Sequence, residues 1–225
     1  MSEHVNGHGD RPTVVVAGLY RSGSTCTAGV LFRLGLHLGD KFRYIEAVHG
    51  AWPHGDFEDL ELFRLCMKAY KEPYPDRLVP DDQVVAMLSG YFAGLQAAAA
   101  AKGTMAATKH PLLCAMLPEI KQVVPNLKVV SVMRPIEESI RSMLAREWWK
   151  HWHCTPDDCE AFQRHLWQQR EANIGDTDHL EVPYADLLAD PKGHIDRIAD
   201  FLGHAPTEQQ RRAADRQVYP HLKHF

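Results

Sequence analysis

The sequence predicts an α/β protein with a three-layer, P-loop-like fold, in which helices flank a central parallel sheet. Short β-branched runs, such as the one at 13–17, alternate with longer segments of helical periodicity. Runs of this kind are typical of strands buried on both faces of a parallel sheet. A chain of 225 residues that is 45% hydrophobic and 24% charged can form one core without disulfides. We expect a flexible tail over residues 1–11 and a single domain over residues 12–225.

The predicted elements follow one another in regular alternation. Strands are expected at four places, 13–17, 104–108, 128–133 and 180–182. Helices are expected over 24–34, over 57–70, over 81–102 with Asp81 as N-cap, and over 191–203. Because the carboxyl ends of parallel strands meet at one edge of the sheet, ligand-binding loops are expected at that edge.

Charge and composition exclude several classes of protein. The 25 basic and 29 acidic side chains give a net charge of -4, which argues against nucleic acid as a partner. We find no run of 18 apolar residues and expect no membrane span. The N-terminal residues lack a secretory signal and the five cysteines are odd in number, so we expect free thiols in the cytoplasm. The oligomeric state does not follow from the sequence.

A glycine-containing loop, GLYRSGST at 18–25, joins the first strand to its helix. Backbone N–H groups and the dipole at a helix N-terminus attract anions, which makes this loop an anion site. Its glycine spacing matches the phosphate loop of nucleotide kinases, but Ser24 occupies the lysine position. A kinase uses that lysine and a bound Mg²⁺ to offset the negative charge of a triphosphate. A sulfuryl group carries less charge and can be bound without a metal. Candidate ligands are Arg21, Ser22, Gly23, Ser24 and Thr25. A kinase and a silent nucleotide-binding protein remain alternatives.

A second basic position follows the strand predicted at 128–133. Arg134 ends this strand, and Ser142 lies on the next helix. If the strand lies beside the first one, Arg134 emerges near the glycine loop. Eight residues of helix rise about 12 Å, so only the long arginine side chain could bridge from Arg134 to Ser142.

Together these segments resemble the PAPS-dependent sulfotransferases, in the bacterial form with arginine in the phosphosulfate loop. GLYRSGST resembles their 5'-phosphosulfate loop, and VVSVMRPIEESIRS resembles the motif in which the residues matching Arg134 and Ser142 bind the 3'-phosphate. VPYADLLADPKGHIDRIADFLG is similar to a segment that places the residue matching Tyr184 at the adenine. VYPHLKHF resembles a basic tail, in which Lys223 would reach the cofactor. The resemblance spans residues 14–203 in the expected order.

This resemblance implies transfer of a sulfuryl group from PAPS to a hydroxyl or amine of a small-molecule, glycan or lipid acceptor, leaving PAP and requiring no metal. Lys109, in the segment TKHP, is the second expected cation beside Arg21, and Thr108 or His110 would touch the acceptor. HGDFEDLELFRL resembles a family segment whose glutamate matches Glu58, although Asp56 occupies a usually aromatic position. Glu58 is therefore our first choice of base.

Other candidate residues stay open at this point. His110 is the second choice of base, because an imidazole is intrinsically better matched to neutral pH. Glu46 and His49, in the preceding loop, are further alternatives for the base. Four of the five tryptophans lie between 148 and 167, where an aromatic lid over the acceptor is expected, although core packing explains Trp167 equally well. A metal is a weak alternative, because the spacing of its possible ligands matches no common pattern: His151, His153, Cys154 and Cys159.

Overall fold

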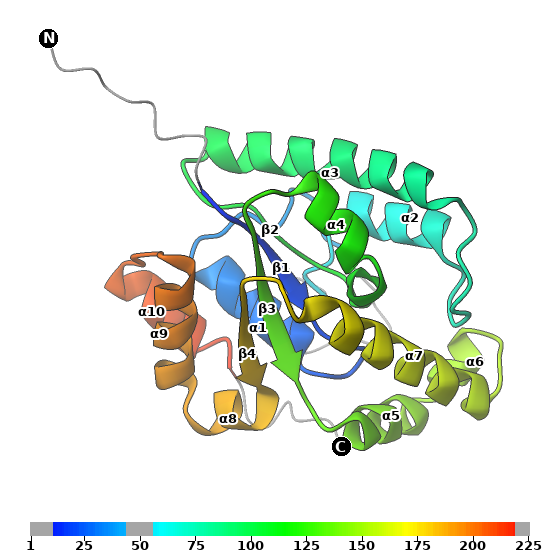
Figure 1. The fold of residues 1–225 in the computed structure, drawn as a ribbon. Coiled ribbons are helices and arrows are strands. Elements are labelled where there is room, and N and C mark those ends of the chain that lie inside the picture. The colour runs from blue at the N-terminus through cyan, green and yellow to red at the C-terminus, as the bar shows by residue number, and fades with distance from the viewer. Residues whose placement is uncertain (1–10, 44–55, 219–225) are drawn as a thin grey trace, which may run out of the picture.

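The structure, a computed structural model, describes residues 11–43 and 56–218 and contains one parallel sheet (Figure 1). Its strands are β1 (Thr13–Ala17), β2 (Ala107–Lys109), β3 (Leu127–Met133) and β4 (His179–Pro183). They lie in the order β2-β1-β3-β4, and every pairing is parallel. The predicted α/β class and parallel sheet are confirmed.

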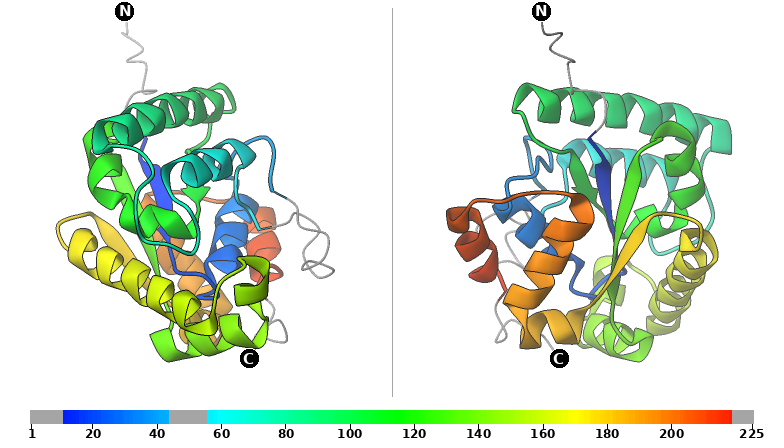
Figure 2. Two further views of the ribbon diagram at one scale, coloured as in Figure 1. Left: turned by 90° about the vertical axis from the view of Figure 1, so that its right-hand side faces the viewer. Right: turned by 60° about the vertical axis from the view of Figure 1, so that its left-hand side comes forward.

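Alternation along the strands produces two hydrophobic clusters, one on each face of the sheet. Helices cover both faces (Figure 2). Val14 and Val16 face one cluster, whereas Val15 and Ala17 face the other, as expected for a strand buried on both faces. The first cluster is covered by α1 (Ser24–Arg33), α8 (Tyr184–Ala189), α9 (Pro191–Leu202) and α10 (Glu208–Asp215). The second is covered by α2 (Leu60–Ala69), α3 (Asp81–Ala101), α4 (Leu117–Val123), α5 (Ile136–Ala145), α7 (Pro156–Ile174) and a 3₁₀ turn at Pro111–Ala115.

Two local expectations were wrong in detail. The strand predicted at 104–108 begins at Ala107, because Thr104 is held by the backbone at the end of α3 and Ala106 bridges to His37. The N-cap of α3 is Pro80, and Asp81 is the first helical residue. Its carboxylate forms an ion pair with Arg77, 2.5 Å away, which stabilises the first turn without capping it.

Helix α3 has the length and composition that could cross a membrane, with a hydropathy of 1.5 over 18 residues. Its side chains at 84, 88 and 92 are nevertheless buried in the second cluster. This helical spacing is typical of a helix that packs one face on a core, and 33% of the apolar window is buried in this way.

The strand order brings the predicted functional residues to one edge of the sheet. In the register, Val16 of β1 lies opposite Lys109 at the end of β2, and Ala17 lies opposite Ser131 near the end of β3. The glycine loop, Lys109 and Arg134 therefore leave the sheet at the same edge, which confirms that the strand before Arg134 is the neighbour of the first strand.

Candidate active site

The glycine loop turns tightly onto the N-terminus of α1. Arg21 and Gly23 both have positive φ angles, of 61° and 96°, and the Ser22 hydroxyl donates to the Leu19 carbonyl at 2.7 Å. No side chain of the described residues caps α1, and its first turn contains no acidic residue. The free N–H groups and the helix dipole at this end suit an anion, as the sequence predicted. Ser24 and Thr25 line a cavity in front of them.

Tyr184, at the start of α8, packs against this loop. A Cβ atom at Gly23 would lie 2.2 Å from the Tyr184 ring, so glycine is required both for its φ angle and for this close approach. The ring is 8% exposed, and burial raises the pKa of its hydroxyl to about 12. Tyr184 therefore connects the loop after β1 to the end of β4.

Arg21 joins the two basic motifs. Its Nε donates to the Ser142 hydroxyl at 3.2 Å, and its backbone carbonyl accepts from Nη1 of Arg134 at 2.8 Å. Arg134 turns toward the glycine loop and pairs with Glu138 at 3.1 Å, whereas Ser142 contacts Arg21. Binding of one 3'-phosphate by Arg134 and Ser142 stays a prediction. The residues that the sequence placed in one site do meet, through Arg21.

Positive charge accumulates around Arg21. Burial lowers the pKa of its guanidinium to about 10, and repulsion from Arg146 and Arg134 acts in the same direction. Asp56 and Tyr184 offset this only in part. Because three arginines close together repel one another, a bound anion would relieve the repulsion.

Lys109 and Glu58 form a buried ion pair beside this cluster. Their side chains are 3% and 6% exposed, and Nζ lies 2.7 Å from Oε1. Arg43 lies 3.4 Å from the other carboxylate oxygen, Oε2. Burial alone would raise the pKa of Glu58, but Lys109, His110 and Arg43 together hold it well below its usual range. Glu58 is therefore ionised at neutral pH.

His110 lies behind Glu58. Its Nδ1 accepts from the backbone N–H of Leu112 at 3.2 Å, which assigns the proton of the neutral ring to Nε2, 3.8 Å from Glu58. Burial lowers the pKa of His110 to about 4, and Glu58 offsets this only in part. Thr108 is fully buried and within 2.8 Å of the Tyr91 hydroxyl. Neither Thr108 nor His110 is among the described residues that line the cavity, and their contact with an acceptor stays a prediction.

The cavity has a volume of about 230 Å³ and two chemically different walls. Its basic wall carries the ion pair and the arginines: Arg21, Arg43, Glu58, Lys109 and Arg146. Its aromatic wall consists of Tyr20, Glu72, Trp148 and Trp152. Trp148 belongs to α6 (Trp148–His151), and Trp152 follows it, so the tryptophans expected to form an acceptor lid do contribute two side chains.

A second cavity, of about 420 Å³, is lined by Arg134, whose Nη1 donates to the Arg21 carbonyl. Its lining includes Arg134, Tyr184 and Trp167, whose ring is 37% exposed and therefore not part of the core. Because Arg21 lines one cavity and Arg134 the other, the two cavities are neighbours.

The remaining predictions are only partly covered. Within residues 11–43 and 56–218, no group of three or more potential metal ligands occurs. Cys154 and Cys159 lie 3.6 Å apart at sulfur, and His151 instead lines the first cavity. The predicted ligand Lys223 and the alternatives Glu46 and His49 lie outside the described residues.

The sequence did not single out Arg43, Glu72 or Arg146 as site residues. Arg43 and Glu72 lie in segments between helices and strands that carry no recognisable sequence motif. They reach the cavity only through contacts with segments that are distant in the sequence. Arg146 follows directly after α5, and its position four residues beyond Ser142 was a usable signal.

Comparison with known proteins decides the family. A model described as the sulfotransferase family matches residues 12–208. The chain belongs to the sulfotransferase family. Among curated proteins no significant match was found.

Solved sulfotransferase structures share this fold. STF1 from Mycobacterium tuberculosis H37Rv superposes with a TM-score of 0.64 and 18% identity, over 95% of this chain and 73% of that one. STF9 from Mycobacterium avium gives 0.62 and 14%, over 92% and 67%. The sulfotransferase domain of the Synechococcus PCC 7002 olefin synthase gives 0.56 and 20%, over 89% and 76%.

Proposed function

We propose that this sulfotransferase transfers the sulfuryl group of PAPS to a hydroxyl or amine of a small-molecule, glycan or lipid acceptor. The observation that carries the proposal is the pair of neighbouring cavities joined at Arg21 and Arg134. A donor with an anion at each end needs two basic positions near one another but facing separate spaces. The geometry of these two arginines meets that requirement.

The side chains of both cavities fit such a donor. In the first cavity, Arg21 and the N-terminus of α1 would hold the phosphosulfate, with Ser24 and Thr25 beside it. In the second cavity, Arg134 would hold the 3'-phosphate, and the ring of Tyr184 would lie at the nucleoside. Ser142 would orient the Arg21 guanidinium through its hydrogen bond. Ser22 and Gly23 would shape the loop rather than contact the donor through side chains.

The chemistry requires cations at the leaving oxygen and a base for the acceptor proton. When bound, PAPS supplies a sulfur whose bond to the bridging phosphate oxygen breaks while a new S–O or S–N bond forms to the acceptor. Arg21 and Lys109 stabilise the negative charge that develops on the leaving phosphate. Glu58 takes the proton of the acceptor, since its carboxylate is ionised and lines the cavity. His110 lies 3.8 Å from Glu58 without a hydrogen bond to it, and its Nδ1 lone pair is taken by the Leu112 N–H.

The Glu58–Lys109 ion pair couples donor binding to basicity. A carboxylate held far below its usual pKa is a weak base while its cation stays in place. Lys109 would be shared between Glu58 and the sulfonate of a bound donor, and a weaker hold of Lys109 on Glu58 would raise the pKa of that carboxylate. Glu58 therefore becomes a stronger base at the moment at which a base is needed.

The proposal is tested by incubating the purified protein with PAPS and a broad panel of hydroxyl and amine acceptors in EDTA, with PAP release and acceptor sulfation followed by mass spectrometry. We expect sulfated product without divalent metal. PAP binding without turnover on any acceptor would favour a silent nucleotide-binding protein. Binding of ATP with Mg²⁺ and no affinity for PAP would contradict the proposal.

A further inference from the structure

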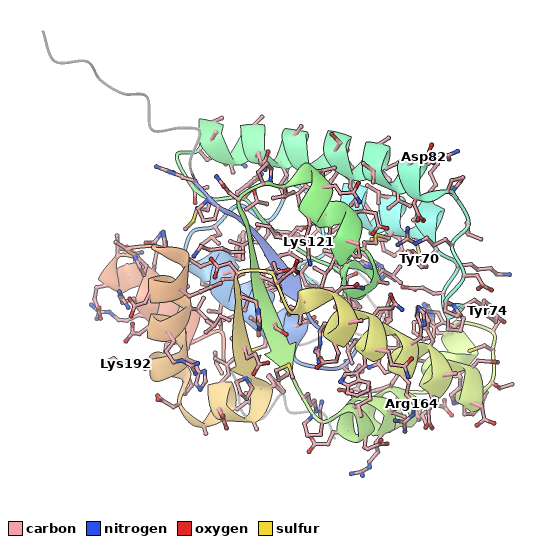
Figure 3. All side chains as sticks on the ribbon, in the orientation of Figure 1. Tyr70, Tyr74, Asp82, Lys121, Arg164 and Lys192 are labelled. Carbon is pink, nitrogen blue, oxygen red and sulfur yellow. The ribbon has the colours of Figure 1, made fainter. Side chains whose placement is uncertain are left out.

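Glu72 has surroundings unlike those of Glu58 in the same cavity. It lies on the connection between α2 and α3, which Tyr70 and Tyr74 bracket in Figure 3 and which reaches down to α6 in Figure 1. The Tyr20 hydroxyl donates to Glu72 Oε1, and the Trp152 side chain hydrogen-bonds to the same carboxylate. Both donors are neutral, so hydrogen bonding is satisfied while the charge is not compensated.

No cation of the described part of the chain forms an ion pair with Glu72. Burial raises the pKa of Glu72 to about 7, and the hydrogen bond from Trp152 opposes this only weakly. Lys109 and Arg43, in contrast, both pair with Glu58 in the same cavity. A carboxylate removed from water without a counter-ion is unfavourable, and a cation from outside the chain would remove the penalty.

Aromatic rings surround this carboxylate. The Tyr20 ring centre lies 5.3 Å from that of Trp148 and 5.2 Å from that of Trp152, and the two tryptophans are 5.3 Å apart at 88°. Trp148 and Trp152 are partly exposed and line the cavity. The faces of indole and phenol rings attract cations, and tryptophan does so most strongly. The phenol hydroxyl and the indole N–H lie in the planes of their rings, so Glu72 meets the edges of Tyr20 and Trp152, while both tryptophans line the same cavity. A carboxylate and tryptophan rings in one cavity together suit an ammonium group.

We propose that the aromatic wall of the first cavity binds an ammonium group of the acceptor, with Glu72 as its counter-ion and Trp148 and Trp152 as its aromatic contacts. This inference rests on the proposed function and narrows its acceptor to hydroxyl compounds that also carry a positively charged amine. The arginines of the basic wall repel that ammonium. An acceptor of this class is therefore held with its amine at Glu72 and its hydroxyl toward Glu58 and Lys109.

The test compares two acceptors of nearly equal shape, tyramine and 4-ethylphenol, by calorimetric titration of the PAP-loaded protein and of the protein alone. We expect the wild-type protein to bind tyramine about tenfold more tightly than 4-ethylphenol. Glu72→Gln keeps the size and the hydrogen-bond acceptor but removes the charge, so the affinity ratio should fall to about one. Glu181→Gln, an exposed glutamate on β4, makes the same change of charge elsewhere and should leave the ratio unchanged.

A second variant protects the test against misfolding. Trp148→Leu removes an aromatic ring from the cavity but keeps the carboxylate and both of its hydrogen-bond donors, Tyr20 and Trp152, and it should lower the preference for tyramine by about threefold. Equal affinities of the wild-type protein for both acceptors, or a preference that survives Glu72→Gln, would overturn the inference. Failure to bind PAP would instead count against the proposed function, and the titrations without PAP would still decide whether the ammonium site exists.

Discussion

Glu58 and Glu72 line one cavity, yet their surroundings shift their pKa values in opposite directions. Burial raises the pKa of both, but Lys109, His110 and Arg43 reverse this effect at Glu58. Glu72 meets a phenol hydroxyl and an indole N–H, which satisfy its oxygens without supplying charge. The comparison teaches that the nearest cations, and not burial alone, determine which form of a carboxylate is stable.

The two carboxylates consequently suit different tasks. Glu58 is part of a compensated network that can exchange its cation with an incoming anion, which suits proton transfer at the reacting end. Glu72 has no ion-pair partner among the described residues, which suits recognition of a positively charged group of the acceptor at the aromatic wall of the cavity. The following variants test whether the basic and aromatic walls act separately in this way.

The largest effect is expected from Glu58→Gln. Removing the base should lower turnover by about 100-fold or more, because general-base catalysis contributes about that much. PAP affinity should not fall, since Lys109 loses a competitor for the anion. Turnover is measured at saturating PAPS, with Glu181→Gln as the charge-matched control. If turnover is unchanged, the base lies elsewhere.

Arg134→Ala separates the two ends of the donor. Loss of a charge-assisted phosphate contact should weaken PAP binding by about 1.5 to 3 kcal/mol, or roughly 10- to 150-fold. Affinity for adenosine 5'-phosphosulfate, which lacks the 3'-phosphate, should change little. Arg164→Ala is the control, because Arg164, labelled on α7 in Figure 3, lines neither cavity and pairs with Glu137 and Glu160. Equal losses for both nucleotides would show that Arg134 does not read the 3'-phosphate.

Gly23→Ala tests the contact between the glycine loop and Tyr184. The added methyl group meets the Tyr184 ring and a positive φ angle together, so the free energy of unfolding should fall by about 1–3 kcal/mol. Gly203→Ala is the control, because Gly203 also has a positive φ angle, of 62° against 96° at Gly23, but has open space around it. Urea denaturation should therefore show the larger loss at position 23. If Gly23→Ala lowers the free energy of unfolding no more than Gly203→Ala does, the Tyr184 ring moves away from the added methyl group at little cost.

A smaller effect concerns pH and stability. The pKa of His110 is about 4 in the folded protein, against 6.5 for an unperturbed histidine. Between pH 4 and pH 6.5 the unfolded chain therefore binds a proton at His110 that the folded protein does not. Stability should therefore fall as pH drops from 6.5 toward 4, by up to about 1.4 kcal/mol per pH unit from this residue. His110→Asn keeps an acceptor for the Leu112 N–H and should flatten this part of the profile. A profile that keeps its slope in the variant would assign the effect to other groups.

The sequence predicted the frame of the site better than its contacts. Strand β1 and the meeting of the glycine loop with Arg134 follow from hydrophobic runs and from the rules of parallel sheets. The hydrogen-bond partner of Ser142 could not be predicted from the sequence. Arg21 and Arg134 are both long enough to reach its hydroxyl, and only the packing of the folded protein selects Arg21. Glu72 was missed because its contact with Tyr20 joins residues 52 apart in the chain, and no local pattern encodes such a contact.

The central claim, that the two basic positions hold one donor, is tested most directly by calorimetric titration of the protein with PAP in EDTA. We predict binding of one PAP per chain without metal, weakened in Arg21→Ala and in Arg134→Ala separately. Absence of binding to the wild-type protein, or binding that neither substitution affects, would contradict the account.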